Sequence, residues 1–133
     1  MNLQEQISRI QSMMGVVDEY IYHGTSFDNA INVLNNGFVQ ATYWGDYSTA
    51  ENYANSYDNP VLIKLELNDI IDLLEPNYTL INFYEESGDD DYKEIIDEWY
   101  DSNQTVYDSL RIFDSAILPP THIQIEKNNI IRL

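Results

Sequence analysis

Five residues in the first half of the chain have the types and spacing to bind a small polar molecule. His23 ends a short apolar run and is followed at once by Gly24 and Thr25, and Tyr43 and Tyr53 lie ten residues apart. Imidazole and hydroxyl groups form hydrogen bonds, glycine allows close approach to the backbone, and tyrosine rings offer flat apolar faces. The stretch over residues 20–57 therefore predicts a small-molecule cleft that the rest of the chain frames.

Each of these residues also has a structural alternative. A lone histidine at a strand end is commonly a hydrogen-bonded structural residue, and it is the Gly-Thr pair and the later tyrosines that favour ligand binding. Tyr53 shares a predicted helical face with Ala54, so packing in a core is an equal alternative for its ring. Tyr43 directly precedes a Trp-Gly break, which favours a site, whereas His122 is expected in a surface turn.

Alternating strands and helices are predicted to position these side chains. A strand over residues 19–23 leads to Ser26, a suitable helix N-cap, and the following helix ends before Gly37. A second extended segment carries Tyr43.

The next predicted helix begins near Ser48, because Glu51 three residues later completes a capping-box pattern. Asn59 and Pro60 end this helix, since a residue before proline disfavours the helical conformation. Residues 61–67 form the clearest strand, with apolar residues at 61, 63, 65 and 67 on a core face and Lys64 and Glu66 on the opposite face.

The second half of the chain gives weaker patterns. A short helical turn over 69–74 precedes a segment, 78–86, that is ambiguous between strand and loop, and an aspartate-rich loop leads to a helix over 92–102. Four short strands are predicted further on, at Leu110–Phe113, Ile117–Leu118, Ile123–Glu126 and Ile130–Leu133.

Composition limits the classes of function. The chain has 133 residues with 23 acidic and six basic side chains, a formal net charge of −17. Six scattered cations cannot form the basic stripe that binds phosphates, so direct nucleic-acid binding is disfavoured. The acidic excess favours a plain solvated surface, with attraction of a basic partner or mimicry of a nucleic acid as the alternative. The lack of cysteine excludes disulfides and thiolate chemistry.

The domain prediction has two parts. Leu3, Ile7, Ile10 and Met14 repeat at helical spacing and predict an N-terminal amphipathic helix over residues 1–15, with one domain over residues 16–133. No apolar run is long enough to span a membrane, and the N-terminus lacks the basic and apolar blocks of a secretory signal. An intracellular, cytoplasmic or phage-type context without membrane attachment is therefore expected.

Other reaction centres find no support in the sequence. The two histidines lie 99 positions apart, which disfavours a histidine-based metal site, and the aspartates at 89–91 lack the ligand spacing of a calcium loop. Neither a phosphate-binding loop nor a nucleophile elbow is present, so no metal is predicted.

A family resemblance links these residues. The segments Tyr22–Thr25, Thr42–Gly45 and Ser48–Ala54 resemble, in order and spacing, the first two motifs of ADP-ribosyltransferases of the histidine-tyrosine-glutamate kind, the group of the poly(ADP-ribose) polymerases and diphtheria-type toxins. The resemblance covers about residues 20–67 and, weakly, the region near 117–123.

The resemblance implies a role for each site residue, with NAD as the substrate. His23 would hold a ribose through hydrogen bonds, and the Gly24 backbone would pair with the nicotinamide carboxamide. Thr25 stands where the family often has a serine, and it would supply the same hydroxyl group. Tyr43 and Tyr53 would sandwich the nicotinamide ring. Physical chemistry agrees, because aromatic faces stabilise a cationic ring.

The third motif is where the sequence departs from the family. The resemblance implies a glutamate near the start of a late strand. The region that corresponds to this motif, residues 107–113, contains no glutamate. Asp108 and Ser109 are nearest to the expected position, although aspartate is one carbon shorter. A carboxylate would stabilise the oxocarbenium-like transition state, so Asp108 is the predicted catalytic acid, beside His23 and Tyr43, and poly(ADP-ribose) synthesis is disfavoured.

Together these observations predict an α+β domain in which two small β-sheets frame a cleft and helices flank them. The expected function is NAD-dependent mono-ADP-ribosyl transfer to an unidentified acceptor, expected to be a protein, with release of nicotinamide. The alternative is a non-catalytic acidic interaction protein on the same fold, such as a phage-type inhibitor or DNA mimic, whose residues 85–101 bind a basic partner.

Overall fold

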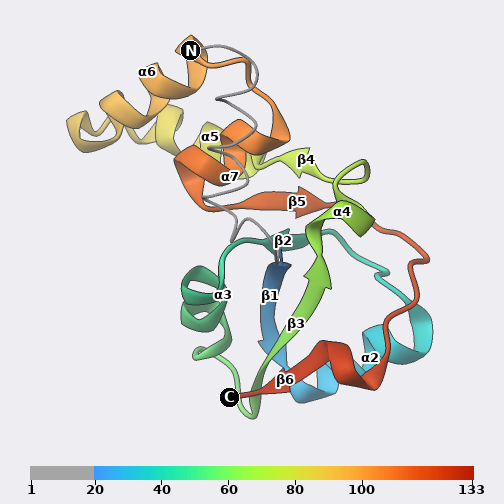
Figure 1. Ribbon diagram of the computed structural model, residues 1–133. Coiled ribbons are helices and arrows are strands. Elements are labelled where there is room, and N and C mark those ends of the chain that lie inside the picture. Colours follow the sequence, from blue (N-terminus) through green and yellow to red (C-terminus); the bar gives the residue numbers. More distant parts are fainter. Residues whose placement is uncertain (1–19) are drawn as a thin grey trace.

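A computed structural model describes residues 20–133. The predicted helix over residues 1–15 therefore lies outside the described residues. The described part has six α-helices and two three-stranded antiparallel sheets, with strand orders β1-β3-β6 and β2-β5-β4. Figure 1 shows the first sheet below the second, with α5, α6 and α7 gathered on one side of the second sheet. The predicted α+β class with two small sheets is confirmed.

The first sheet is built on a central strand that is buried on both faces. β3 (Pro60–Glu66) lies between β1 (Tyr20–Ser26) and β6 (Ile130–Arg132). Val61, Leu62 and Ile63 are each 0% exposed. A run of adjacent apolar residues is typical of a strand covered on both sides, so the strand predicted over 61–67 is confirmed with a core on each face.

The second sheet is joined to the first by one bridge. β5 (Ala116–Leu118) pairs with both β2 (Thr42–Trp44) and β4 (Glu75–Pro76). Tyr22 and Gly45 then exchange two backbone hydrogen bonds of 2.9 Å between β1 and the end of β2. This bridge brings the strand that carries His23 beside the strand that carries Tyr43.

Three helices surround the first sheet. In α2 (Phe27–Asn36) the Ser26 side chain accepts a hydrogen bond from the backbone N–H of Asn29, which confirms the predicted N-cap. α3 (Tyr47–Ala54) packs against β1, and α4 (Leu67–Ile70) follows β3. The principal core lies between the sheets and includes Ile21, Phe38, Trp44, Ile63, Ile70, Leu118 and Ile125.

The start of α3 differs from the prediction. Asp46, not Ser48, is the N-cap, and its carboxylate accepts a 2.8 Å hydrogen bond from the backbone N–H of Thr49. Aspartate is as good an N-cap as serine, and its earlier position adds two residues to the helix.

A second helical group has its own small core. α5 (Tyr78–Ser87), the 3-10 helix η1 (Asp90–Tyr92), α6 (Lys93–Asp101) and α7 (Val106–Phe113) pack around Ile81, Trp99 and Phe113. The helix predicted over 92–102 is confirmed.

Two predicted elements of this group are wrong in type. Residues 78–86, predicted as strand or loop, form α5, and Leu110–Phe113, predicted as a strand, is the last turn of α7. Short apolar runs do not distinguish a strand from a buried helix. The Asn77 and Thr105 N-caps decide for helix, since each side chain accepts a hydrogen bond from a backbone N–H in the first turn.

The C-terminal segment confirms two of its three strands. β5 and β6 form as predicted, but Ile123–Glu126 is not a strand. After Pro119 and Pro120 the chain forms only a single bridge, between Phe38 and Thr121, and Ile125 then fills the core. Among the helices of residues 20–133, none has the length and hydrophobicity to cross a membrane.

Candidate functional site

His23 is held as a neutral imidazole. Its Nδ1–H donates a 2.7 Å hydrogen bond to the carbonyl oxygen of Tyr43, and its ring centroid lies 5.5 Å from that of Trp44. Burial lowers the pKa of His23, and the hydrogen bond to Tyr43 only partly opposes this. Because a carbonyl oxygen can only accept, Nδ1 carries the proton and Nε2 keeps its lone pair.

The Nε2 of His23 is open to a ligand. It has no hydrogen-bond partner within residues 20–133, and no buried side-chain nitrogen or oxygen in this range lacks one. Within this range, no group therefore uses the lone pair of Nε2. A neutral imidazole in this state can accept a hydrogen bond from a sugar hydroxyl.

Gly24 turns its peptide groups toward the open edge of β1. Tyr22 uses its N–H and carbonyl for the bridge to Gly45, so these groups point away from β3. Hydrogen-bonding direction alternates along an antiparallel strand, so Gly24, two residues later, points the same way. Among the described residues, none bonds to the N–H or the carbonyl of Gly24. A carboxamide could pair with this donor and acceptor as a neighbouring strand would.

The absence of a side chain at Gly24 also has a structural cause. A Cβ atom there would lie 2.0 Å from the carbonyl oxygen of Ala50 and 2.8 Å from the backbone nitrogen of Ala54. Gly24 thus lets α3 lie directly on β1, where Ala50 and Ala54 pack with Leu62. The same glycine serves packing on one side and leaves a free strand edge on another.

Tyr43 and Tyr53 present rings that stack on no other ring of the described part of the chain. Tyr43, on β2, is 42% exposed, and Tyr53, on α3, is 53% exposed. Tyr53 is therefore not a core residue, and the alternative that its ring fills a hydrophobic core is wrong. The structure brings Tyr43 to His23 through the main-chain bond and brings the helix of Tyr53 to Gly24.

Thr25 is buried rather than open. It is 4% exposed, and its hydroxyl accepts a 3.1 Å hydrogen bond from the side-chain amide of Asn29 in the first turn of α2. The hydroxyl therefore helps to hold the first turn of α2 against the end of β1.

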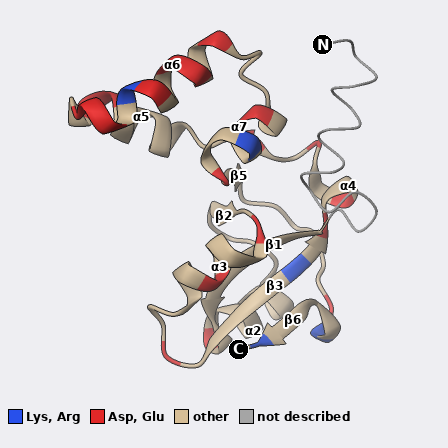
Figure 2. Ribbon diagram, turned by 60° about the vertical axis from the view of Figure 1, so that its left-hand side comes forward, with Lys and Arg blue, Asp and Glu red and all other residues tan. Residues whose placement is uncertain are grey.

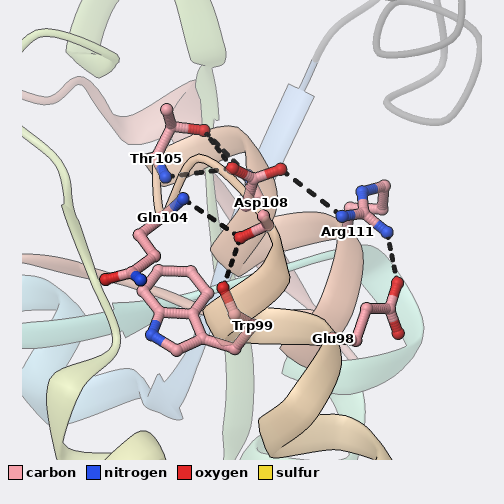
Figure 3. A network of polar contacts seen from close by, with 7 residues as sticks. Glu98, Trp99, Gln104, Thr105, Asp108 and Arg111 are labelled. Atoms are coloured by element: carbon pink, nitrogen blue, oxygen red, sulfur yellow. Dashed lines mark hydrogen bonds and ion pairs between the residues drawn. The ribbon is translucent and has the colours of Figure 1, made fainter. Parts of the chain in front are cut away.

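Asp108 lies in a structural network at the start of α7 (Figure 3). Its carboxylate accepts hydrogen bonds from the backbone N–H and the hydroxyl of Thr105, and it pairs with Arg111, which also pairs with Glu98. Burial raises the pKa of Asp108, but the bonds from Thr105 and the charge of Arg111 outweigh it, and the pKa is lowered overall. Its charge is thus already balanced by the fold.

Ser109, the other residue near the predicted third motif, is sealed in the protein. It is 0% exposed, donates a hydrogen bond to the carbonyl oxygen of Ser115 and accepts one from the backbone N–H of Asn77. Its hydroxyl stabilises the junction between α7 and β5.

Asp114 is an acid at the start of the late strand that sequence reasoning missed. It lies two residues before β5, in a left-handed conformation with φ of 54°, and a Cβ placed on Gly45 would lie 2.2 Å from its carbonyl oxygen. Asp114 therefore adjoins the bridge between Tyr22 and Gly45. Burial, and then the nearby charge of Asp46, raise its pKa. The misassignment of residues 110–113 to a strand hid this position.

Within residues 20–133, no three His, Cys, Asp or Glu side chains are grouped to hold a metal ion. A scan against protein-family models, a search of curated proteins and a search of solved structures found no match to this chain.

Proposed function

We propose that this protein is an NAD-dependent mono-ADP-ribosyltransferase on an ADP-ribosyltransferase-like fold, with a cleft near the bridge between the two sheets. The Nε2 of His23 would accept a hydrogen bond from a ribose hydroxyl, and the free edge at Gly24 would pair with the nicotinamide carboxamide. Tyr43 and Tyr53 would contact the cationic nicotinamide ring, whose charge favours aromatic faces.

The observation that carries the proposal is that the N–H and carbonyl of Gly24, directly after a neutral histidine, have no partner within residues 20–133, and that the Nε2 of this histidine has none there either. A carboxamide offers one donor and one acceptor on a planar group, which matches this edge. Two exposed, unstacked tyrosines on the adjoining elements supply the aromatic contacts.

The reaction would break the glycosidic bond between the nicotinamide nitrogen and the ribose. The bonding electrons leave with nicotinamide, which becomes neutral, and positive charge develops on the ribose. An acceptor nucleophile then forms a bond to the same carbon and loses its proton to solvent. A carboxylate near the sugar would stabilise the developing charge, and the geometry favours Asp114 over Asp108 for this role, because Asp108 is already paired with Arg111.

Two measurements test the proposal. NAD or nicotinamide should shift the backbone amide resonance of Gly24 in an NMR titration, and labelled NAD should release nicotinamide in the presence of a protein acceptor mixture. His23→Ala should abolish release, whereas His122→Ala, the matched control at the exposed second histidine, should not. Absence of both the Gly24 shift and nicotinamide release from the parent protein would refute the proposal.

A pair of variants assigns the carboxylate. Asp114→Asn should reduce nicotinamide release by about 10²-fold, the scale of losing one group that stabilises transition-state charge. Asp108→Asn should change release little, because its present partners are in α7 and the preceding turn. A larger loss of nicotinamide release in Asp108→Asn than in Asp114→Asn would instead assign Asp108 as the catalytic acid.

A further inference from the structure

An aromatic row, formed by Phe83 and Tyr84 of α5 and Tyr92 of η1, lies on the helical group of α5, η1 and α6. Tyr84 of α5 and Tyr92 of η1 have ring centroids 4.4 Å apart, and the ring of Phe83 lies 5.7 Å from that of Tyr84 and 6.0 Å from that of Tyr92. Phe83 is 55% exposed, although its side chain has no polar atom to hydrate. Phe83 is therefore an apolar surface that the described part of the chain does not cover, whereas Tyr84 and Tyr92 are half-buried.

The row continues toward the proposed NAD site. Burial raises the pKa of Tyr84, and the nearby Tyr92, Tyr53 and Asp114 raise it further. The ring of Tyr84 also lies 5.8 Å from that of Phe113, the residue before Asp114, so the inner end of the row adjoins the start of β5. Its outer end is Phe83, whose ring lies near Tyr92 of η1, the 3-10 helix that contains Asp90 and Asp91 and is capped by Asp89.

Negative charge surrounds the aromatic row. Residues 85–101 contain nine acidic side chains and one cation, Lys93. All nine acids are exposed, and of these nine only Glu98 forms an ion pair with a residue of the described range 20–133, namely Arg111. Figure 2 shows this charge as red segments over α5 and α6, while the first sheet below carries little of it.

We propose that the surface of α5, η1 and α6 binds a Lys/Arg-rich segment of a partner protein. Ammonium and guanidinium groups are attracted both by carboxylates and by aromatic faces, and their long aliphatic stems cover exposed apolar rings such as Phe83. The same charge repels nucleic acids and anionic membranes. Charge complementarity thus selects a basic protein segment as the occupant.

The position of the row also assigns the partner a role. A segment that follows the row from Phe83 toward Phe113 would lie beside Asp114, the carboxylate assigned to the proposed NAD site, so the basic partner is the class of acceptor that the enzyme would modify. This role rests on the proposed function, whereas binding of the basic segment does not.

Peptide binding in the absence of NAD tests the surface. The probe is a short fluorescent peptide rich in lysine, compared with the same peptide with glutamine at each lysine, and binding is followed by fluorescence anisotropy at low and physiological salt. The triple variant Asp89→Asn, Asp90→Asn, Asp91→Asn should weaken binding about tenfold, the combined effect of three exposed charge pairs. Asparagine at position 89 keeps the cap of η1, so the fold is retained.

A matched triple variant separates a local surface from overall charge. Asp28→Asn, Asp69→Asn and Asp72→Asn remove the same charge from exposed positions on α2 and around α4, and should weaken binding less than about twofold. Phe83→Ala should weaken binding about threefold through loss of a cation–π contact.

Three outcomes would overturn the inference: equal loss of binding in the two triple variants, unchanged binding in Phe83→Ala, or equal binding of the glutamine peptide. Because no NAD is present, these results are independent of the Gly24 amide shift and nicotinamide release. Peptide binding without NAD turnover would refute the proposed function and retain the surface.

Discussion

Gly24→Ala is the substitution whose effect follows most directly from the packing of α3 on β1. The new Cβ would lie 2.0 Å from the carbonyl oxygen of Ala50, 2.8 Å from the nitrogen of Ala54 and 3.0 Å from the carbonyl carbon of Ala50. All three are backbone atoms of one helix, so no side-chain rotation can relieve the contact. The whole of α3 has to move away from the sheet by about 1 Å, or β1 has to distort.

The expected cost is that of an overpacked core. Such insertions destabilise proteins by about 1–3 kcal/mol, which for a domain of this size lowers Tm by about 4–12 °C. The displaced helix carries Tyr53, so the NMR shift caused by nicotinamide should weaken in the same variant. Ala50→Gly should not rescue it, because the clash is with the Ala50 backbone rather than its side chain.

Thermal unfolding followed by circular dichroism, with Gly88→Ala as the control, checks this prediction. A Cβ on Gly88 meets nothing within 4 Å, but its φ of 63° disfavours alanine, so a loss of about 1 kcal/mol is expected from conformation alone. A Gly24→Ala protein whose Tm equals that of the parent within about 1 °C would refute the close packing of α3 on β1.

Three further predictions concern charge and packing. Folding favours the neutral imidazole of His23, so the unfolded chain, whose histidine pKa is near 6.5, binds the imidazole proton more tightly than the folded chain. The free energy of unfolding should therefore fall as the pH drops from about 6.5 toward the lowered pKa of the folded state. Urea unfolding at about pH 7 and about pH 5 should show a smaller change in His23→Asn than in the parent. Asp46→Asn should keep the α3 cap but lower the pKa of Asp114, because a neighbouring negative charge is lost. An unchanged NMR titration of the Asp114 carboxyl group would contradict the proximity of Asp46 and Asp114. Trp99→Ala should cost about 3–5 kcal/mol in denaturant unfolding, because Trp99 is 2% exposed in the small core with Ile81 and Phe113; a loss below about 1 kcal/mol would show that this core contributes little.

Local patterns account for the elements that the sequence predicted correctly. The Ser26 cap and the apolar run of β3 each act within a few residues, so their effect is visible without knowing the fold. The predicted end of the next helix at Asn59 and Pro60 is wrong, because α3 already ends at Ala54. The chemical types at His23, Gly24, Tyr43 and Tyr53 are likewise properties of the sequence.

Long-range pairing decided the rest. Leu110–Phe113 is apolar enough for either strand or helix, and the packing of Phe113 with Trp99 and Ile81 supports the helix that Thr105 caps, which in turn places Asp114 before β5. Sequence alone thus indicated which groups have the chemistry to bind a small polar molecule. The tertiary structure decided which of them keep unused hydrogen-bonding groups among the described residues, because the alternation of hydrogen bonds along β1 directs the peptide groups of Gly24 away from β3, whereas side-chain bonds commit Thr25 and Asp108.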